Sequence, residues 1–111
     1  MKPYHHTEAQ LETLFRIGVT QRLGGMVVKL APTQAGVPDR LVLLPGHPGW
    51  PSRIELVELK TVVGRLAPIQ REWHRRAAAL GVVVTTLYGK PDIDAWVRDR
   101  ATAYDHLLEV L

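Results

Sequence analysis

The stretch GVPDRLVLL, residues 36–44, begins with two residues that are rare in β-strands and continues as an apolar strand pattern. Pro38 has no backbone N–H to donate to a sheet, and aspartate is depleted in strands. Asp39 therefore either ends a loop or places a functional carboxylate at the end of a sheet where a strand begins. The segments that follow help to decide between these interpretations.

A second strand pattern, RIELVELK at residues 53–60, follows a loop rich in proline and glycine. Two strands joined by such a loop are expected to pair antiparallel, so that the start of the first lies beside the end of the second. This pairing brings Asp39 next to Glu58 and Lys60. Glu58 and Lys60 share a strand face because strand side chains alternate. Two carboxylates and an ammonium are thus expected to converge.

The other periodicities predict three helices and two further strands. Thr7 followed by Gln10 is typical of a capping box, Pro68 of a first helical turn, and Asp92 of a helix cap. The expected elements are a helix at 8–24, strands at 26–31, 40–44 and 53–60, a helix at 68–80, a buried central or parallel strand at 82–89, and a helix at about 92–110. This order predicts an α/β fold in which helices flank a mixed sheet, as one domain over 1–111.

The composition is that of an ordinary globular domain with a basic surface. Hydrophobic residues make up 46% of the 111 residues, and the net charge of +3 is carried by ten arginines and four lysines. Arginine binds phosphate oxygens through two parallel hydrogen bonds, which favours nucleic acid as a partner. The absence of cysteine excludes disulfides and thiolate metal sites. No signal peptide or membrane-spanning run is present, so we expect a soluble cytoplasmic protein without a membrane partner.

The converging side chains suit the hydrolysis of phosphodiesters. Carboxylate oxygens are the ligands that Mg²⁺ takes, usually few in number and supplemented by waters. A bound divalent ion lowers the pKa of its water and stabilises charge on a phosphoryl group. Lys60 is expected to orient the attacking water or help to deprotonate it, and to balance the anionic charge.

These residues resemble the signature of the PD-(D/E)xK nucleases, with Pro38-Asp39 followed by Glu58-Leu59-Lys60. GVPD together with ELKTVVGRLAPIQREWHRRAAALG resembles, more narrowly, the VRR-NUC domain, the virus-type replication-repair nuclease. The resemblance covers about residues 7–88. It implies a restriction-endonuclease-like core, α-β-β-β-α-β, to which this chain adds a C-terminal helix. It also implies a DNA endonuclease that uses Mg²⁺ or Mn²⁺ in DNA repair or in phage, cuts branched DNA such as a Holliday junction, and works as a homodimer.

The resemblance assigns roles to individual residues. Asp39, Glu58 and the backbone carbonyl of Leu59 are implied to be metal ligands, while Lys60 serves the hydrolytic water. Gln70 matches a helix glutamine that borders the active site.

The family also carries a glutamate on its first helix, beside the metal. Two candidates lie four residues apart on one helical face, Glu8 and Glu12. The resemblance favours Glu8, because it opens the helix in the family manner, and Glu12 is the alternative. The family often has serine or threonine where this chain has Ala67, which leaves a helix cap from that position in question.

Ordinary structural roles compete with several of these assignments. A second Pro-Asp pair at 91–92 is explained by helix capping alone, so the dipeptide gains meaning only from the ELK strand and the glutamine helix. Arg65, Arg71 and Arg75 either follow a phosphate backbone or are ordinary surface residues, since Glu72 lies three and four residues from Arg75 and Arg76 and helix-surface pairing is an equally economical explanation.

The remaining candidates have roles in packing. We expect Ile69 and Trp73 in the core, and the last helix to supply a dimer surface as well as core. His47 and Trp50 are expected to pack in their loop, with contact to DNA or to a partner subunit as the alternative.

The sequence is compatible with three functions. The first is the metal-dependent endonuclease, with DNA ends or flaps as an alternative substrate. The second is a non-catalytic DNA-binding or assembly module on the same fold. The third is a small basic RNA-binding protein, which the absence of exposed strand aromatics disfavours.

Overall fold

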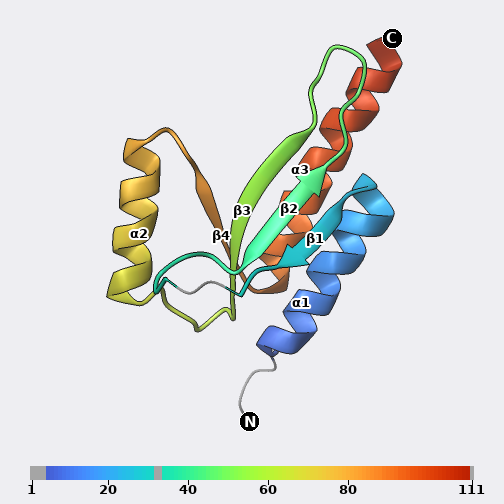
Figure 1. The fold of residues 1–111 in the computed structure, drawn as a ribbon. Coiled ribbons are helices and arrows are strands. Elements are labelled where there is room, and N and C mark those ends of the chain that lie inside the picture. Colours follow the sequence, from blue (N-terminus) through green and yellow to red (C-terminus); the bar gives the residue numbers. More distant parts are fainter. Residues whose placement is uncertain (1–4, 32–33, 111) are drawn as a thin grey trace.

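Four strands form one mixed sheet in the computed structural model, which describes residues 5–31 and 34–110 (Figure 1). The strands are β1 (Met26–Lys29), β2 (Arg40–Leu44), β3 (Arg53–Lys60) and β4 (Val84–Tyr88), in the spatial order β1-β2-β3-β4. β1 and β3 each pair antiparallel with β2, and β4 runs parallel to β3. The predicted mixed sheet is therefore confirmed, and β2 and β3 have the predicted bounds.

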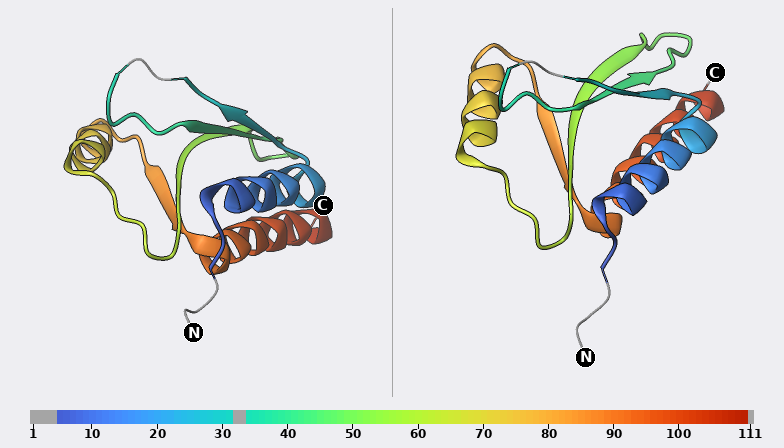
Figure 2. Two further views of the ribbon diagram at one scale, coloured as in Figure 1. Left: turned by 90° about the horizontal axis from the view of Figure 1, so that it is seen from below. Right: turned by 60° about the horizontal axis from the view of Figure 1, so that its bottom comes forward.

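The helices lie on both sides of this sheet (Figure 2). They are α1 (Glu8–Ile17), continued by the π-helical turn η1 (Gly18–Arg22), α2 (Pro68–Ala79) and α3 (Gly89–Val110). The predicted capping box opens α1, because Thr7 and Gln10 satisfy each other's backbone N–H groups. Within 5–31 and 34–110, no helix combines the length and the apolarity needed to cross a membrane.

The core fills the space between the sheet and the pair α1 and α3, which lie side by side (Figure 2). Alternate residues of β2 and β3 face this core, where they meet an apolar stripe from each helix. The buried apolar residues include Leu11, Phe15, Val19, Val42, Leu44, Val57, Leu59, Leu87, Ile93, Trp96, Val97, Ala101 and Tyr104. Gly18 allows the helices to approach closely, because a Cβ there would lie 2.9 Å from a methyl group of Val97. The apolar stripe of α3 is thus core over 93–104, and the dimer surface expected from this helix stays a prediction.

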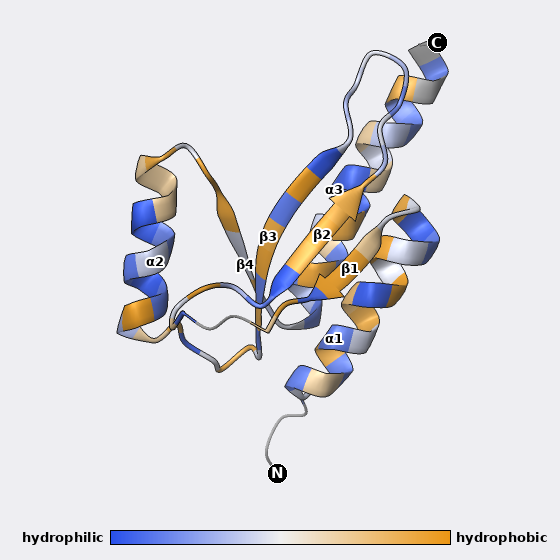
Figure 3. Cartoon of the chain, viewed as in Figure 1, coloured by the Kyte–Doolittle hydropathy of each residue, from blue (hydrophilic) through white to orange (hydrophobic). Residues whose placement is uncertain are grey.

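The opposite side of the sheet is only lightly covered by α2. Ala77 is the one residue of α2 that is buried, and most of the helix is hydrophilic (Figure 3). The prediction that Ile69 belongs to the core is wrong: its side chain is 52% exposed, and it contacts the turn at Gly36 instead. Trp73 is half-buried.

β4 is parallel, as predicted, but it forms an edge of the sheet and is not fully buried. Val83, just before it, is 75% exposed because α2 covers only part of this edge.

Polar and aromatic contacts join the long helix α3 to the sheet and to its β2–β3 loop. Arg100 donates two hydrogen bonds to the carboxylate of Glu55 on β3, at 2.6 and 3.0 Å, and its guanidinium lies 3.8 Å from the ring centroid of Trp96. The loop between β2 and β3 packs on the same helix, because His47 and Trp50 both contact the ring of Tyr104. This packing agrees with the predicted role of those two residues.

Replacing Arg100 by Met should destabilise the fold by about 1.5–3 kcal/mol, since the change leaves the carboxylate of Glu55 unpaired where it is largely shielded from water. Urea denaturation measures the loss. The control is Arg98→Met, because Arg98 is 66% exposed and its ion pair with Asp99 spans 3.7 Å in solvent. That variant should stay within about 0.5 kcal/mol of the wild type. Equal effects of the two changes would contradict a structural role for the Arg100 contacts.

Candidate active site

Asp39 and Glu58 meet at one end of the pairing between β2 and β3. The last pair of the ladder joins Arg40 to Val57, and both of these side chains face the core. One step further, the same register sets Asp39 opposite Glu58, on the other face of the sheet. Glu58 is only 5% exposed, whereas Asp39 is partly open to solvent. The predicted convergence of the two carboxylates therefore agrees with the observed register.

The pKa of Glu58 is raised above its ordinary value. Burial is the largest cause, because it disfavours the charged form, and the neighbouring charge of Asp39 adds to it. Lys60 and Arg40 act in the opposite direction without cancelling the shift. Two acidic groups thus share a poorly solvated place, where additional positive charge would stabilise the ionised forms.

Gln70 connects α2 to Glu58. Its amide Nε2 donates a hydrogen bond to Oε1 of Glu58, and its own Oε1 accepts from the backbone N–H of Ala67 at 2.8 Å. Ala67 has no hydroxyl, so the reciprocal half of a capping box is absent and the Gln70 N–H donates to the Ala67 carbonyl instead. The predicted position of Gln70 beside the site agrees with this geometry. The hydrogen bond from Gln70 to Glu58 forms although Ala67 provides no side-chain cap.

The turn before Asp39 holds the start of α2 close to this end of the sheet. Gly36 has φ +90°, and a Cβ on it would lie 2.6 Å from the carbonyl oxygen of Ile69. Only glycine meets both conditions without strain. The GVPD motif therefore brings together the two segments that carry Asp39 and Gln70.

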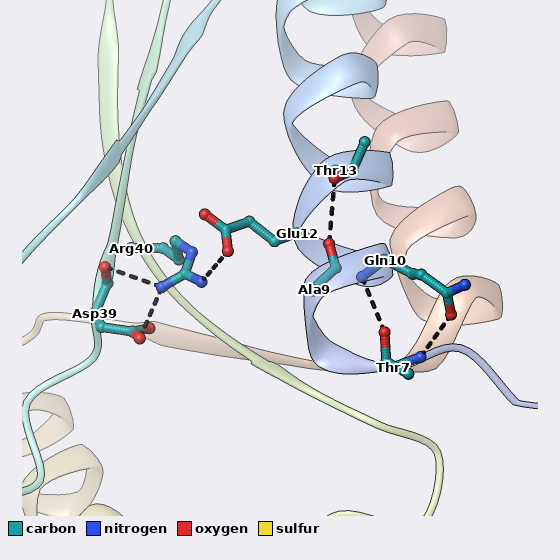
Figure 4. A network of polar contacts seen from close by, with 7 residues as sticks. All are labelled: Thr7, Ala9, Gln10, Glu12, Thr13, Asp39 and Arg40. Carbon is teal, nitrogen blue, oxygen red and sulfur yellow. Dashed lines mark hydrogen bonds and ion pairs between the residues drawn. The ribbon is translucent and has the colours of Figure 1, made fainter.

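A buried arginine links Asp39 to α1 on the other side (Figure 4). Nη1 of Arg40 lies 2.7 Å from Oδ2 of Asp39, and Nη2 lies 3.1 Å from Oε2 of Glu12. Of the two predicted glutamates on α1, Glu12 is thus the one connected to Asp39. Glu8 is exposed in the first turn.

Lys60 lies on the same face of β3 as Glu58, and at the end of the pairing with β4. The pKa of His74 on α2 is lowered, above all by burial and also by the charge of Lys60. Within the part of the chain that the structure describes, Nε2 of His74 is buried without a hydrogen-bond partner.

Sequence reasoning missed both His74 and Arg40. The available signals were the spacing of four residues between Gln70 and His74, and the position of Arg40 directly after Asp39.

The other predicted residues lie around this centre. The side chain of Leu59 is buried in the core, between Glu58 and Lys60 in the chain. Arg65, Arg71 and Arg75 are exposed, and Arg75 forms an ion pair with Glu72 at 2.6 Å. The ion pair with Glu72 is therefore sufficient to explain Arg75 at this position. Contact of the three arginines with DNA stays a prediction.

A solved structure described as a VRR_NUC domain has the same fold. The similarity has a TM-score of 0.66 and 27% sequence identity, and it covers 82% of this chain and 94% of that domain. The chain has the fold of a VRR_NUC domain. This confirms the resemblance found in the sequence, together with the α/β fold class of a mixed sheet flanked by helices. No protein-family model and no curated protein sequence matches the chain.

The carboxylates of this VRR_NUC-like fold suit a divalent ion with few protein ligands. Among residues 5–31 and 34–110, no group of three or more His, Cys, Asp or Glu side chains is placed to hold a metal. Asp39 and Glu58 form a pair, and Mg²⁺ is commonly bound by one or two carboxylates and several waters. The fit is also electrostatic, since the mutual repulsion of the pair is relieved by a cation.

Replacing Glu58 by Gln should stabilise the metal-free protein at neutral pH. Because the folded state raises the pKa of Glu58, the ionised carboxylate destabilises the fold above that pKa, and the penalty disappears as the pH falls through it. The substituted amide carries no charge and still offers an oxygen to Gln70. Urea denaturation in EDTA should therefore show a gain at pH 7 that shrinks towards acid pH.

Glu72→Gln is the matched control, because the hydrogen bond from Arg75 lowers the pKa of Glu72. That change removes a favourable charge and should not stabilise the protein. A Glu58→Gln variant that is less stable than the wild type at pH 7 would contradict the assigned electrostatics.

Proposed function

We propose that this protein is a metal-dependent deoxyribonuclease of the PD-(D/E)xK type. The observation that carries the proposal is the placement of Asp39 and Glu58 side by side across the β2–β3 pairing, with Lys60 on the same face as Glu58. The similarity to a VRR_NUC domain supports nuclease activity, and the basic composition is compatible with DNA as the substrate.

Each residue at this centre has a role in the proposed reaction. Asp39, Glu58 and the backbone carbonyl of Leu59 would hold Mg²⁺ or Mn²⁺, an ion that supplies an activated water and stabilises phosphoryl charge when bound. Lys60 orients the attacking water and offsets the anionic charge. Gln70 fixes the carboxylate of Glu58 through its hydrogen bond. The carboxylate that α1 contributes to the proposed site is Glu12 and not Glu8, because Arg40 joins Glu12 to Asp39.

The substrate is proposed to be branched or otherwise structured DNA, such as a four-way junction, cut by a homodimer. Two copies of the site are needed to cut two strands of a junction in a coordinated way. Exposed apolar side chains at Leu80 and Val83, which are 83% and 75% exposed, offer contact area for a second copy. Arg65 and Arg71 are available for phosphate contacts, and the cytoplasmic location stays a prediction.

The rival function is a DNA-binding or assembly module without turnover. A module that only binds DNA has no chemical need for Asp39, Glu58 and Lys60 together at one end of a sheet. A nuclease that acts on DNA ends or flaps uses the same site, so it is distinguished from the junction nuclease by its substrate alone.

Cleavage assays with Mg²⁺, Mn²⁺ or EDTA on linear, flapped and four-way-junction DNA test the proposal. Metal-dependent cutting is expected, and Lys60→Met or Asp39→Asn should lower its rate by about 10²- to 10⁴-fold. Asp92→Asn is the matched control, because Asp92 belongs to the second Pro-Asp pair and accepts a hydrogen bond from the Tyr88 N–H at 2.8 Å. It should leave the cleavage rate unchanged.

Each outcome of this assay bears on a different part of the proposal. If no substrate is cut under any metal condition, the enzymatic function is wrong. If cutting survives in both site variants, the site is misplaced. Equal rates on all three substrates, or a monomer by sedimentation at micromolar concentration, would remove the junction-cutting dimer and leave the nuclease.

The two glutamates of α1 provide an internal comparison. Glu12→Ala should lower the cleavage rate by at least about tenfold, because it releases the guanidinium of Arg40 from one of its two carboxylates. Glu8→Ala removes a carboxylate from the same helix at an exposed position and should leave the rate within about twofold of the wild type. The reverse order of effects would restore Glu8 as the α1 residue of the site.

A further inference from the structure

Arg40 is among the few charged residues that the fold buries, and its side chain is only 9% exposed. It begins β2 and faces the core side of the sheet, as Val42 does two residues later. Nη1 contacts both the carboxylate and the backbone carbonyl of Asp39, while Nη2 contacts Glu12 (Figure 4). In the described part of the chain, Nε of Arg40 is buried without a hydrogen-bond partner.

Fold stability alone does not account for this arrangement. Burying a guanidinium is unfavourable, and an apolar residue of similar volume often serves a core at least as well. One carboxylate is enough to neutralise the charge, as Glu55 does for Arg100. Arg40 instead contacts two carboxylates from different elements, and one of them is Asp39 of the candidate active site.

We propose that Arg40 is a positioning residue of the metal site: its guanidinium, a fork of N–H groups, joins Glu12 to Asp39 and thereby fixes the carboxylate of Asp39 beside Glu58. This role rests on the proposed metal-dependent function. Arg40 contacts Oδ2 of Asp39, and the carboxylates of Asp39 and Glu58 would together hold the ion. Glu12 holds the opposite side of the guanidinium, so the α1 carboxylate acts through Arg40.

The positive charge of Arg40 disfavours the binding of a cation nearby, whereas the positioning of Asp39 favours it, so the two effects oppose each other. Its burial decides between them, because a guanidinium enclosed by β2 and α1 cannot swing into solvent when an ion arrives. It stays as part of the support of the site. Outer partners of this kind commonly change metal affinity by about 10- to 100-fold when they are replaced.

Calorimetric titration of the full chain with Mn²⁺ tests this role without any measurement of cleavage. Arg40→Lys keeps the charge but loses the fork, and Arg40→Met keeps an apolar side chain of considerable length. Both should bind Mn²⁺ about 10- to 100-fold more weakly than the wild type. Arg100→Lys is the control, because it disturbs a comparable pair away from the site; it should lower stability and leave the Mn²⁺ affinity unchanged.

A double-mutant cycle separates positioning from a general loosening of the fold. Arg40→Lys and Glu12→Gln act on the same contact, so their combined effect on Mn²⁺ affinity should be clearly smaller than the product of the single effects. Independent, multiplying effects would overturn the proposal. If Arg40→Met does not fold, Arg40→Lys and the cycle still decide the question.

The remaining outcomes are distinct from one another. Wild-type affinity in Arg40→Lys would overturn the need for the fork, and tighter binding in either variant would show that Arg40 competes with the ion. Both results leave the proposed nuclease in place. Failure of the wild type to bind Mn²⁺ would instead overturn the metal-dependent function and, with it, the role of Arg40.

Discussion

Five residue pairs hold β2 against β3, and the antiparallel register that they fix ends with Arg40 opposite Val57. Asp39 lies one residue beyond this ladder, so the register alone brings it to Glu58 on the face away from the core. A slip of one residue would move every side chain of β2 to the opposite face of the sheet. Val42 would then leave the core and Asp39 would enter it. The apolar alternation that stabilises the sheet thereby also positions the carboxylates.

Glu58 is the residue of the proposed site that most clearly lowers the stability of the fold. Glu58 is buried beside another acid, and the fold compensates this only in part through Gln70, Lys60 and Arg40. A buried position selected for stability alone would carry an apolar residue. Violations of this kind are expected where a fold keeps chemistry at the expense of stability. The electrostatic strain is therefore itself a reason to place the function at this end of β3.

The sequence predicts well those features that depend on local signals. The bounds of β2 and β3, the capping box at Thr7 and the adjacency of Asp39 and Glu58 follow from alternation, turn residues and hairpin geometry. The choice between Glu8 and Glu12, the burial of Arg40 and the exposure of Ile69 depend on how each helix is rotated and placed against the sheet. No local pattern contains that information, because these rotations follow from the packing of residues distant in the chain.

The support of the site differs between its two sides. Glu12 and Arg40, which support the carboxylate of Asp39, belong to the tightly packed half formed by β2, β3, α1 and α3. Gln70 belongs to α2, which buries only Ala77 and therefore has few apolar contacts to resist displacement. Elements with few buried contacts open at low free energy. Within the proposed site, the helix that carries Gln70 and the exposed Arg71 is thus held by fewer buried contacts than the strands that carry the two carboxylates.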